Sequence, residues 1–257
     1  MASAVERHGG GGEQTPPGKA MTVEQHAVDK SAMVLQSLAP IKGMKQHVCT
    51  FALCSRDLGR QIETHHYVSR LNHNFLQCAV YDSDDSRARL IGVEYIVSEN
   101  IYETLPEDEQ KLWHSHAYEI KSGLWVSPRL PEVVVRPELE NLAKTYGKFW
   151  CTWHTQRVYG AYIYIYMNAG DKLPIGTPSL MMSPQGVNLG MVKPDLVYNR
   201  DHKYKISTDR LKGSRVDIPE PEWINPMSDY WKQHDRKGFV LEAEITEMIK
   251  RPAAAFP

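Results

Sequence analysis

The sequence predicts an α+β fold: one domain with a mainly antiparallel sheet, short helices and an extended, proline-rich C-terminal arm. Strand-like and helix-like segments are short and do not alternate regularly, which argues against the repeated strand–helix–strand units of a parallel sheet. The 257 residues include 42% hydrophobic and 24% charged residues, an ordinary globular composition. A chain of this length buries roughly 70–75% of its unfolded surface, so it needs neither a disulfide nor a metal to stay folded.

The N-terminal part divides into a disordered segment and a helix. Residues 1–21 are rich in glycine, proline, alanine and charge, and we expect them to be disordered. A helix is predicted over Val23–Ala39, with Thr22 as its N-cap and Pro40 ending it. Its apolar stripe, widened by Val34 and Leu38, comprises Val28, Ala32, Leu35 and Ala39. Such a stripe packs on its own domain or lies on a lipid surface, and the sequence leaves both open.

Several later segments have the apolar or alternating character of strands. They are Val48–Leu53, His66–Leu71, Phe75–Tyr81, Leu90–Val97, His114–Lys121 and Lys148–Thr155. The third ends in an acidic turn, and the fourth alternates only partly.

Short helices are predicted between and after these strands. One runs from Thr104 to Trp113, because a proline and three acidic residues occupy its first turn. A second covers Pro137–Tyr146 and is closed by Gly147 at a C-cap position. A third lies at about Pro194–Lys203, within a loop-rich region. The following arm is too rich in proline for regular structure, and we expect it to be anchored by Trp223, Tyr230 and Trp231.

Charge and composition exclude several classes of protein. The net charge is −1, so no global basic field favours nucleic acid. No apolar run approaches the ~18–20 residues of a membrane-spanning helix, and the first residues lack the apolar core of a signal peptide. The sparse cysteines, Cys49, Cys54, Cys78 and Cys151, do not form a disulfide framework. We therefore expect a cytosolic protein with reduced thiols.

Histidine provides the clearest chemical signal. The chain has eleven histidines, and five of them stand out. These and a nearby acid are His65, His66, His114, His116, His154 and Glu119. A His-x-His pair on a strand directs both imidazoles to one face, and imidazole with carboxylate suits a divalent transition metal. The opposing interpretation is a set of hydrogen-bonded structural histidines, and Glu119 lies on the opposite face if the strand is regular.

No common catalytic motif accompanies the histidines. The sequence lacks a phosphate-binding loop, a dinucleotide-binding fingerprint, a nucleophile elbow and a His-Glu-x-x-His helix. A partial likeness to cupins rests on the His-x-His pair, Glu119 and Pro174-Ile175-Gly176, but Ser179 stands where a histidine is expected. Catalytic residues therefore stay unassigned, and enzyme activity is an open question.

Long stretches of the chain resemble the plant oil body-associated protein family. They extend from about Ala32 to Glu247 and read QHVCTFALCSRDLGRQIETHHYVSRLNHNFLQCAVYDSD, LIGVEYIVSE, LPEDEQKLWHSHAYEIKSGLW, YGKFWCTWHT, LPIGTPSLMMSPQGVNLGMVKPDLV and EPEWINPMSDYWKQH. We accordingly expect one family domain over residues 22–247 and a flexible tail over 248–257.

The resemblance implies a seed protein that associates with oil bodies and helps to keep their size and shape normal. The family lacks the long apolar hairpin of oleosins, so we expect a cytoplasmic protein attached peripherally to the oil-body surface or to oil-body proteins. The histidine motifs belong to the family pattern, which strengthens the metal hypothesis. The alternative function is a metal-dependent enzyme of unknown substrate, centred on His114 and His116.

One segment departs from the family pattern. After Arg157 the chain carries an additional stretch, residues 158–169, before the Gly-Asp-Lys-Leu-Pro segment. Its Tyr and Ile codons can form an unbroken TATATA run, and its ends can supply GT and AG, so we interpret it as retained intron sequence. The alternative is a genuine hairpin extension with tyrosines on one face and isoleucines on the other.

Overall fold

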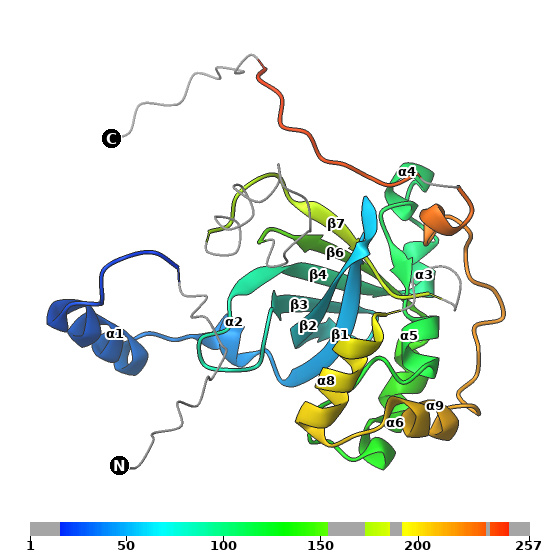
Figure 1. The fold of residues 1–257 in the computed structure, drawn as a ribbon, viewed down its shortest axis with the longest axis horizontal. Coiled ribbons are helices and arrows are strands. Elements are labelled where there is room, and N and C mark those ends of the chain that lie inside the picture. The colour runs from blue at the N-terminus through cyan, green and yellow to red at the C-terminus, as the bar shows by residue number, and fades with distance from the viewer. Residues whose placement is uncertain (1–15, 154–172, 186–191, 235–236, 247–257) are drawn as a thin grey trace, which may run out of the picture.

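Six antiparallel strands close into a barrel at the centre of the structure (Figure 1). The computed structural model describes residues 16–153, 173–185, 192–234 and 237–246. The strands are β1 (Gln46–Cys54), β2 (Asp57–Asn72), β3 (Phe75–Tyr81), β4 (Leu90–Ser98), β5 (His114–Ser115), β6 (Thr145–Cys151) and β7 (Ser179–Met182). Their order is β4-β3-β2-β1-β7-β6-β5, and pairing of β4 with β6 closes the barrel. The short β5 pairs with β6 beyond the end of β7.

The barrel interior is filled by every second residue of its strands. In β3, Leu76, Cys78 and Val80 are buried while their neighbours are only partly covered, as the two-residue period of a strand requires. These side chains meet Val48 of β1 and Ile96 of β4 in the main core cluster. The predicted α+β fold with a mainly antiparallel sheet is therefore confirmed.

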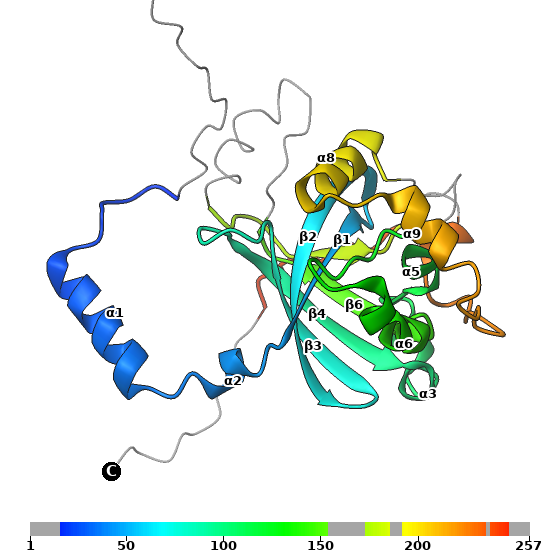
Figure 2. The ribbon, with the colours of Figure 1, turned by 90° about the horizontal axis from the view of Figure 1, so that it is seen from below.

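Short helices gather around one end of the barrel (Figures 1 and 2). They are α3 (Glu99–Tyr102), α4 (Glu107–Gln110), α5 (Ala117–Lys121), α6 (Glu132–Leu142), α8 (Pro194–Tyr204) and α9 (Thr208–Ser214). Two fully buried arginines hold this end together. Arg200 donates to the carbonyl of Leu124 at 2.8 Å, and Arg215 donates to those of Ile120 and Trp125 at 2.8 and 2.9 Å. Buried guanidinium groups require such acceptors, so these bonds fix the segment that follows α5.

The N-terminal helix stands apart from the barrel (Figure 2). Helix α1 covers Val23–Leu35, and the four-residue α2 covers Ala39–Lys42. Thr22 caps α1 through a capping box with Gln25, which confirms the predicted N-cap. The predicted end at Ala39 is wrong, because Gln36 is already extended and Pro40 lies in the first turn of α2 instead of ending α1. A proline in the first turn of a helix lacks only an N–H that has no helical partner.

Most strand predictions are close to the observed elements, and two further helix predictions are wrong in extent. The bounds of β3 agree with the prediction, whereas β2 begins nine residues before the predicted His66. The helix predicted from Thr104 to Trp113 is reduced to α4. The helix predicted over Pro137–Tyr146 instead begins at Glu132, behind Pro131, and ends at Leu142. Gly147 is not a C-cap but lies within β6, which ends at Cys151 and not at Thr155.

The C-terminal arm runs along the outside of the fold, as predicted, but its anchors differ in part. Trp231, in the short 3₁₀ helix η1 (Tyr230–Lys232), is buried, whereas Trp223 is 53% exposed and is therefore not a buried anchor. Polar groups supply the missing anchors: the backbone N–H of Asn225 donates to the hydroxyl of Tyr146, and that of Asp229 donates to the carbonyl of Trp113.

Three predicted segments fall partly or wholly outside the described residues. They are the disordered segment 1–21, the inserted residues 158–169 and the tail 248–257. The division of the chain into these segments stays a prediction.

Candidate metal centre

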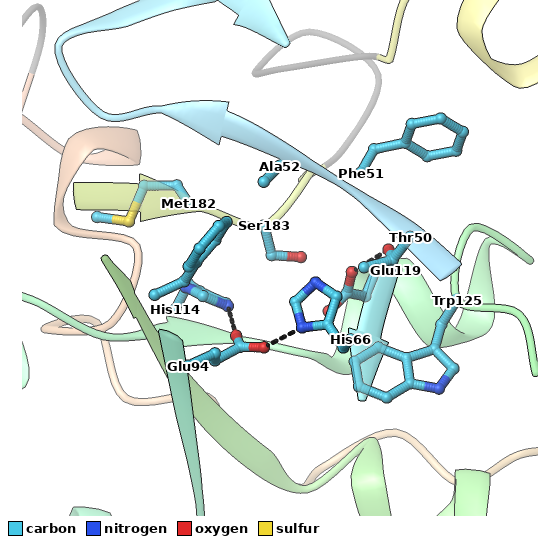
Figure 3. A pocket seen from close by; sticks show the side chains of 11 residues that line it. Thr50, Phe51, Ala52, His66, Glu94, His114, Glu119, Trp125, Met182 and Ser183 are labelled. Atoms are coloured by element: carbon cyan, nitrogen blue, oxygen red, sulfur yellow. Dashed lines mark hydrogen bonds and ion pairs between the residues drawn. The ribbon is translucent and has the colours of Figure 1, made fainter. Parts of the chain in front are cut away.

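Four of the predicted site residues meet inside the barrel, at the end covered by helices. His66 comes from β2, His114 from β5, His116 from the turn after β5 and Glu119 from α5. They lie around Glu94 of β4, and Figure 3 shows Glu94 together with His66, His114 and Glu119. Each of the five residues is at most 3% exposed. The structure thus assembles three imidazoles and two carboxyl groups from four segments of the chain.

Strand register directs these side chains inward. His66 faces Val48 and Val80 on the neighbouring strands, and Glu94 lies opposite Cys78 and Phe149. Since residues in register share a face, both belong to the barrel interior. His114 lies opposite Gly147 of β6, where no side chain separates it from Glu94.

The predicted strand His114–Lys121 is wrong after its second residue. β5 ends at Ser115, His116 has helical backbone angles and α5 begins at Ala117. A helical turn brings residues three apart to the same side, so Glu119 returns toward His116. The expectation that Glu119 faces away from the histidines held only for a regular strand, and the structure overturns it.

Glu94 is the centre of the cluster. Its Oε1 lies 3.1 Å from His114 Nε2, and its Oε2 lies 2.8 Å from His66 Nδ1. His116 Nε2 lies 3.6 Å from Glu94 Oε1 and 3.7 Å from Glu119 Oε1. One ligand atom each from Glu94, His114 and His116 lies within 4.8 Å of the other two. This spacing suits donor atoms around one ion.

Burial and mutual charge perturb the pKa values of the cluster. Burial alone raises the pKa of Glu94, but His66, His114 and His116 around it lower that pKa well below its usual range. Burial raises the pKa of Glu119 to about 8, against the opposing effects of His114 and Thr50. Burial lowers the pKa of His116, whereas the bond to Glu94 overcomes burial and raises the pKa of His114. Glu94 is therefore the anionic carboxylate of the site at neutral pH.

A second layer of hydrogen bonds fixes the cluster. Thr50 Oγ1 donates to Glu119 Oε2 at 2.7 Å. The backbone of Ser115, between the two histidines, is held from both sides: its N–H donates to Asp229 Oδ2 at 3.2 Å, and its carbonyl accepts from Gln185 Nε2 at 3.0 Å. Such outer partners orient metal-binding side chains. The C-terminal arm thereby contributes to the geometry of the site through Asp229.

One further predicted site residue, His65, does not join the cluster, and the other lies outside the described residues. His65 points to the outside of the barrel, because consecutive residues of a strand face opposite sides. There it contacts His47 at 3.0 Å and Glu63 at 3.1 Å, beneath Tyr204 of α8. This outer group also has the spacing of metal ligands, with Cys49, Glu63 and His65 as one set. His154 lies outside the described residues, so its place in the site stays a prediction.

Sequence reasoning missed two residues on which the site depends. Glu94 stands alone in the apolar stretch LIGVEYIV, and its only signal is an acid at an inward-facing position of a strand. Gly147 was interpreted as a helix C-cap, and nothing nearby in sequence connects it with the histidines. Both became visible only through strand pairing.

The arrangement offers two imidazole nitrogens and a carboxylate oxygen in one enclosed space. Imidazole is a ligand for zinc, iron, nickel and copper, and a carboxylate extends the range to manganese. Open positions on such an ion support Lewis-acid chemistry, whereas filled positions make it structural. The chemistry of this cluster thus depends on what completes the coordination.

Fold and site define a class of small closed β-barrel domains with a buried histidine–glutamate cluster. Residues 38–219 match the family model described as "Protein of unknown function (DUF1264)". Oil body-associated protein 2C of Arabidopsis thaliana is 58% identical over 248 residues, covering 96% of this chain and 98% of that protein. The chain belongs to the oil body-associated protein family.

Further relatives agree with this membership. Oil body-associated protein 2A of Arabidopsis thaliana is 54% identical with full coverage of both chains, and oil body-associated protein 2B of Zea mays is 49% identical over 99% of this chain and 97% of its own. No solved structure matches the chain. Within the described ranges, no helix has the length and apolar character to cross a bilayer.

Proposed function

We propose that this chain is a cytoplasmic protein that attaches peripherally to the oil-body surface through α1 and helps to maintain oil-body size and shape. The observation that carries the proposal is the exposure of α1: none of its residues is buried. Its large apolar side chains are nonetheless numerous, namely Val23, Val28, Met33, Val34 and Leu35, each at least 66% exposed. We take the oil body as the lipid surface that α1 contacts, because the relatives are called oil body-associated proteins.

The energetics favour a reversible attachment. Full burial of one aliphatic side chain contributes about 1.5–3 kcal/mol, and only part of α1 faces the lipid at any one time. Binding of this size resembles that of a single lipid chain, which gives marginal anchoring on its own. We therefore expect a second contact, with an oil-body protein or with another exposed segment, to strengthen the association.

A pair of charge substitutions on α1 tests the lipid contact. Val34 and Gln25 are nine residues apart, which is half-integral in helical turns and places them on opposite sides of α1. Val34→Glu introduces a charge among the apolar side chains and should reduce flotation with purified oil bodies at least several-fold. Gln25→Glu adds the same charge but keeps the capping box, and it should float as the unmodified chain does. Equal flotation of both variants would move the contact away from the face of α1 that carries Val34.

The effect on size and shape has its own measurement. Triacylglycerol droplets coated with phosphatidylcholine should coalesce more slowly with the unmodified protein than with Val34→Glu. Light scattering over several hours gives the droplet diameter. If the protein binds the droplets and leaves their growth unchanged, attachment stands and the role in size maintenance is wrong.

A metal-dependent enzyme remains the alternative function. The cluster around Glu94, His114 and His116 favours it, because transition-metal enzymes use such donors. The space that the described residues leave there is about 10 Å³, close to the volume needed for one water molecule. An organic substrate requires the surrounding side chains to open, so we give peripheral attachment precedence.

A further inference from the structure

We propose that Glu94, His114 and His116 bind one divalent transition-metal ion inside the barrel, with Glu119 and His66 beside it. The inference concerns the barrel interior and does not depend on attachment through α1. Three independent features of the structure support it: a nitrogen lone pair without a partner, a glycine that lets the ligand atoms come together, and a buried carboxyl group beside the imidazoles.

The lone pair belongs to His116 Nε2. His116 Nδ1 lies 2.8 Å from Thr145 Oγ1, and that hydroxyl donates its only hydrogen to the carbonyl of Leu142 at 2.7 Å. Thr145 can therefore only accept from His116, which places the proton on Nδ1 in the neutral ring. Nε2 then presents a lone pair to the cluster, and among the described residues it has no hydrogen-bond partner.

The direction of this lone pair is unfavourable without a cation. The carboxyl oxygens Glu94 Oε1 and Glu119 Oε1 lie 3.6 and 3.7 Å away, too far for hydrogen bonds. A buried group left in this state costs about 1–3 kcal/mol. A metal ion between Nε2 and Glu94 gives this lone pair a bonding partner.

Gly147 allows the three ligand atoms to lie close together. A Cβ added to this residue would lie 2.5 Å from Glu94 Oε1, 2.6 Å from His116 Nε2 and 2.7 Å from His114 Nε2. The three ligand atoms thus converge on the position where any other residue carries its first side-chain carbon. Gly147 lies in a strand, where glycine is otherwise unfavourable and often marks a close approach of another group.

The donor set selects the class of metal. Two imidazoles and one carboxylate suit zinc, iron, manganese or cobalt, whereas calcium and magnesium prefer oxygen ligands. Metal–nitrogen bonds of about 2.0–2.1 Å require the three donor atoms to draw closer than their present spacing. Glu119 and His66 stand next to these atoms and complete the immediate surroundings of the ion.

Metal titration of the full chain tests the proposal. The purified protein is stripped with a chelator, incubated separately with Zn²⁺, Mn²⁺ and Co²⁺, passed through a desalting column and analysed for metal. We expect one equivalent of at least one of these ions and a higher melting temperature of the loaded protein. Failure of all three ions to bind stoichiometrically overturns the proposal.

Variants locate the bound ion. Glu94→Gln and His116→Ala should each lower the affinity by at least about 100-fold, beyond the 10–100-fold typical of outer-layer changes. His47→Gln is the matched control, because His47 belongs to the outer group on the other side of β1. If His47→Gln abolishes binding and Glu94→Gln does not, the ion occupies the outer group and the proposal is wrong.

A milder variant covers the case in which these substitutions prevent folding. Thr145→Val removes the hydroxyl that orients His116 and preserves the shape of the side chain. We expect it to fold and to bind the ion about 10–100-fold more weakly. Unchanged affinity of a folded Thr145→Val protein contradicts the role assigned to His116 Nε2.

Discussion

Gly147→Ala places one methyl group at the point where the site atoms converge. The new Cβ lies 2.5–2.7 Å from Glu94, His116 and His114, whereas ordinary van der Waals contact begins at 3.4 Å. Each neighbour must therefore retreat by about 0.7–0.9 Å inside a close-packed barrel. Overpacking of this kind costs about 1–3 kcal/mol, and for a domain of this size that corresponds to roughly 2–12 °C in melting temperature.

A second glycine provides the matched control. Gly213 lies on the exposed side of α9, and a Cβ there meets nothing within 4 Å. Alanine is preferred to glycine in a helix by up to about 1 kcal/mol, so Gly213→Ala should leave stability unchanged or raise it. The same chemical substitution thus has opposite expected signs at the two positions.

The assay compares melting curves with and without metal. At a metal concentration 100 times the dissociation constant, binding stabilises a folded protein by about 2.7 kcal/mol. The unmodified chain and Gly213→Ala should gain this increment, and Gly147→Ala should not. If the Gly147→Ala protein has the melting temperature of the unmodified chain and retains one equivalent of metal, the reasoning about Gly147 is refuted.

Two further predictions concern other parts of the chain. Burial lowers the pKa of His47 to about 4 from the usual 6.5, so the unfolded chain binds the proton first and stability falls as the pH drops from 6.5 toward 4. After allowance for solvent at this half-buried ring, we expect the free energy of unfolding to fall by about 1–2 kcal/mol. Urea unfolding at pH 7.5 and 4.5 should show a smaller fall in His47→Gln than in the unmodified chain. An equal fall in both proteins assigns the effect to another group. Deletion of residues 158–169, between β6 and β7, should leave the circular dichroism spectrum and melting temperature of the barrel unchanged; an unfolded product makes the segment part of the fold.

Short-range patterns predicted much of the sheet. The bounds of β3 followed from its apolar run and acidic turn, and Thr22 was recognisable as a cap because the capping box is local in sequence. The ends of helices were harder to predict from the sequence. The local pattern predicts a helix end at Pro40 and a helix start at Pro137, yet both prolines lie within helices. The effect of a proline depends on its position in the helix and on tertiary contacts.

The candidate site shows the same division. The His-x-His spacing and Glu119 indicated a metal site, but the predicted backbone conformation between them was wrong. A helix and not a strand brings Glu119 to His116. His65 and His66 could not be distinguished by sequence, because the inward face of a strand is set by its register with its neighbours. Glu94 and Gly147 meet the histidines only through pairing of β4, β5 and β6.

By itself, the sequence determined the α+β class, most strand positions, the family and the residue types of the candidate site. These follow from local periodicity, from composition and from long motifs, all of which are properties of neighbouring residues. Only the tertiary structure decided which histidines face the barrel interior, which carboxyl group lies between them and which glycine lets them come together. Those choices depend on barrel closure, which brings residues 66, 94, 114 and 147 to one point although long stretches of chain separate them.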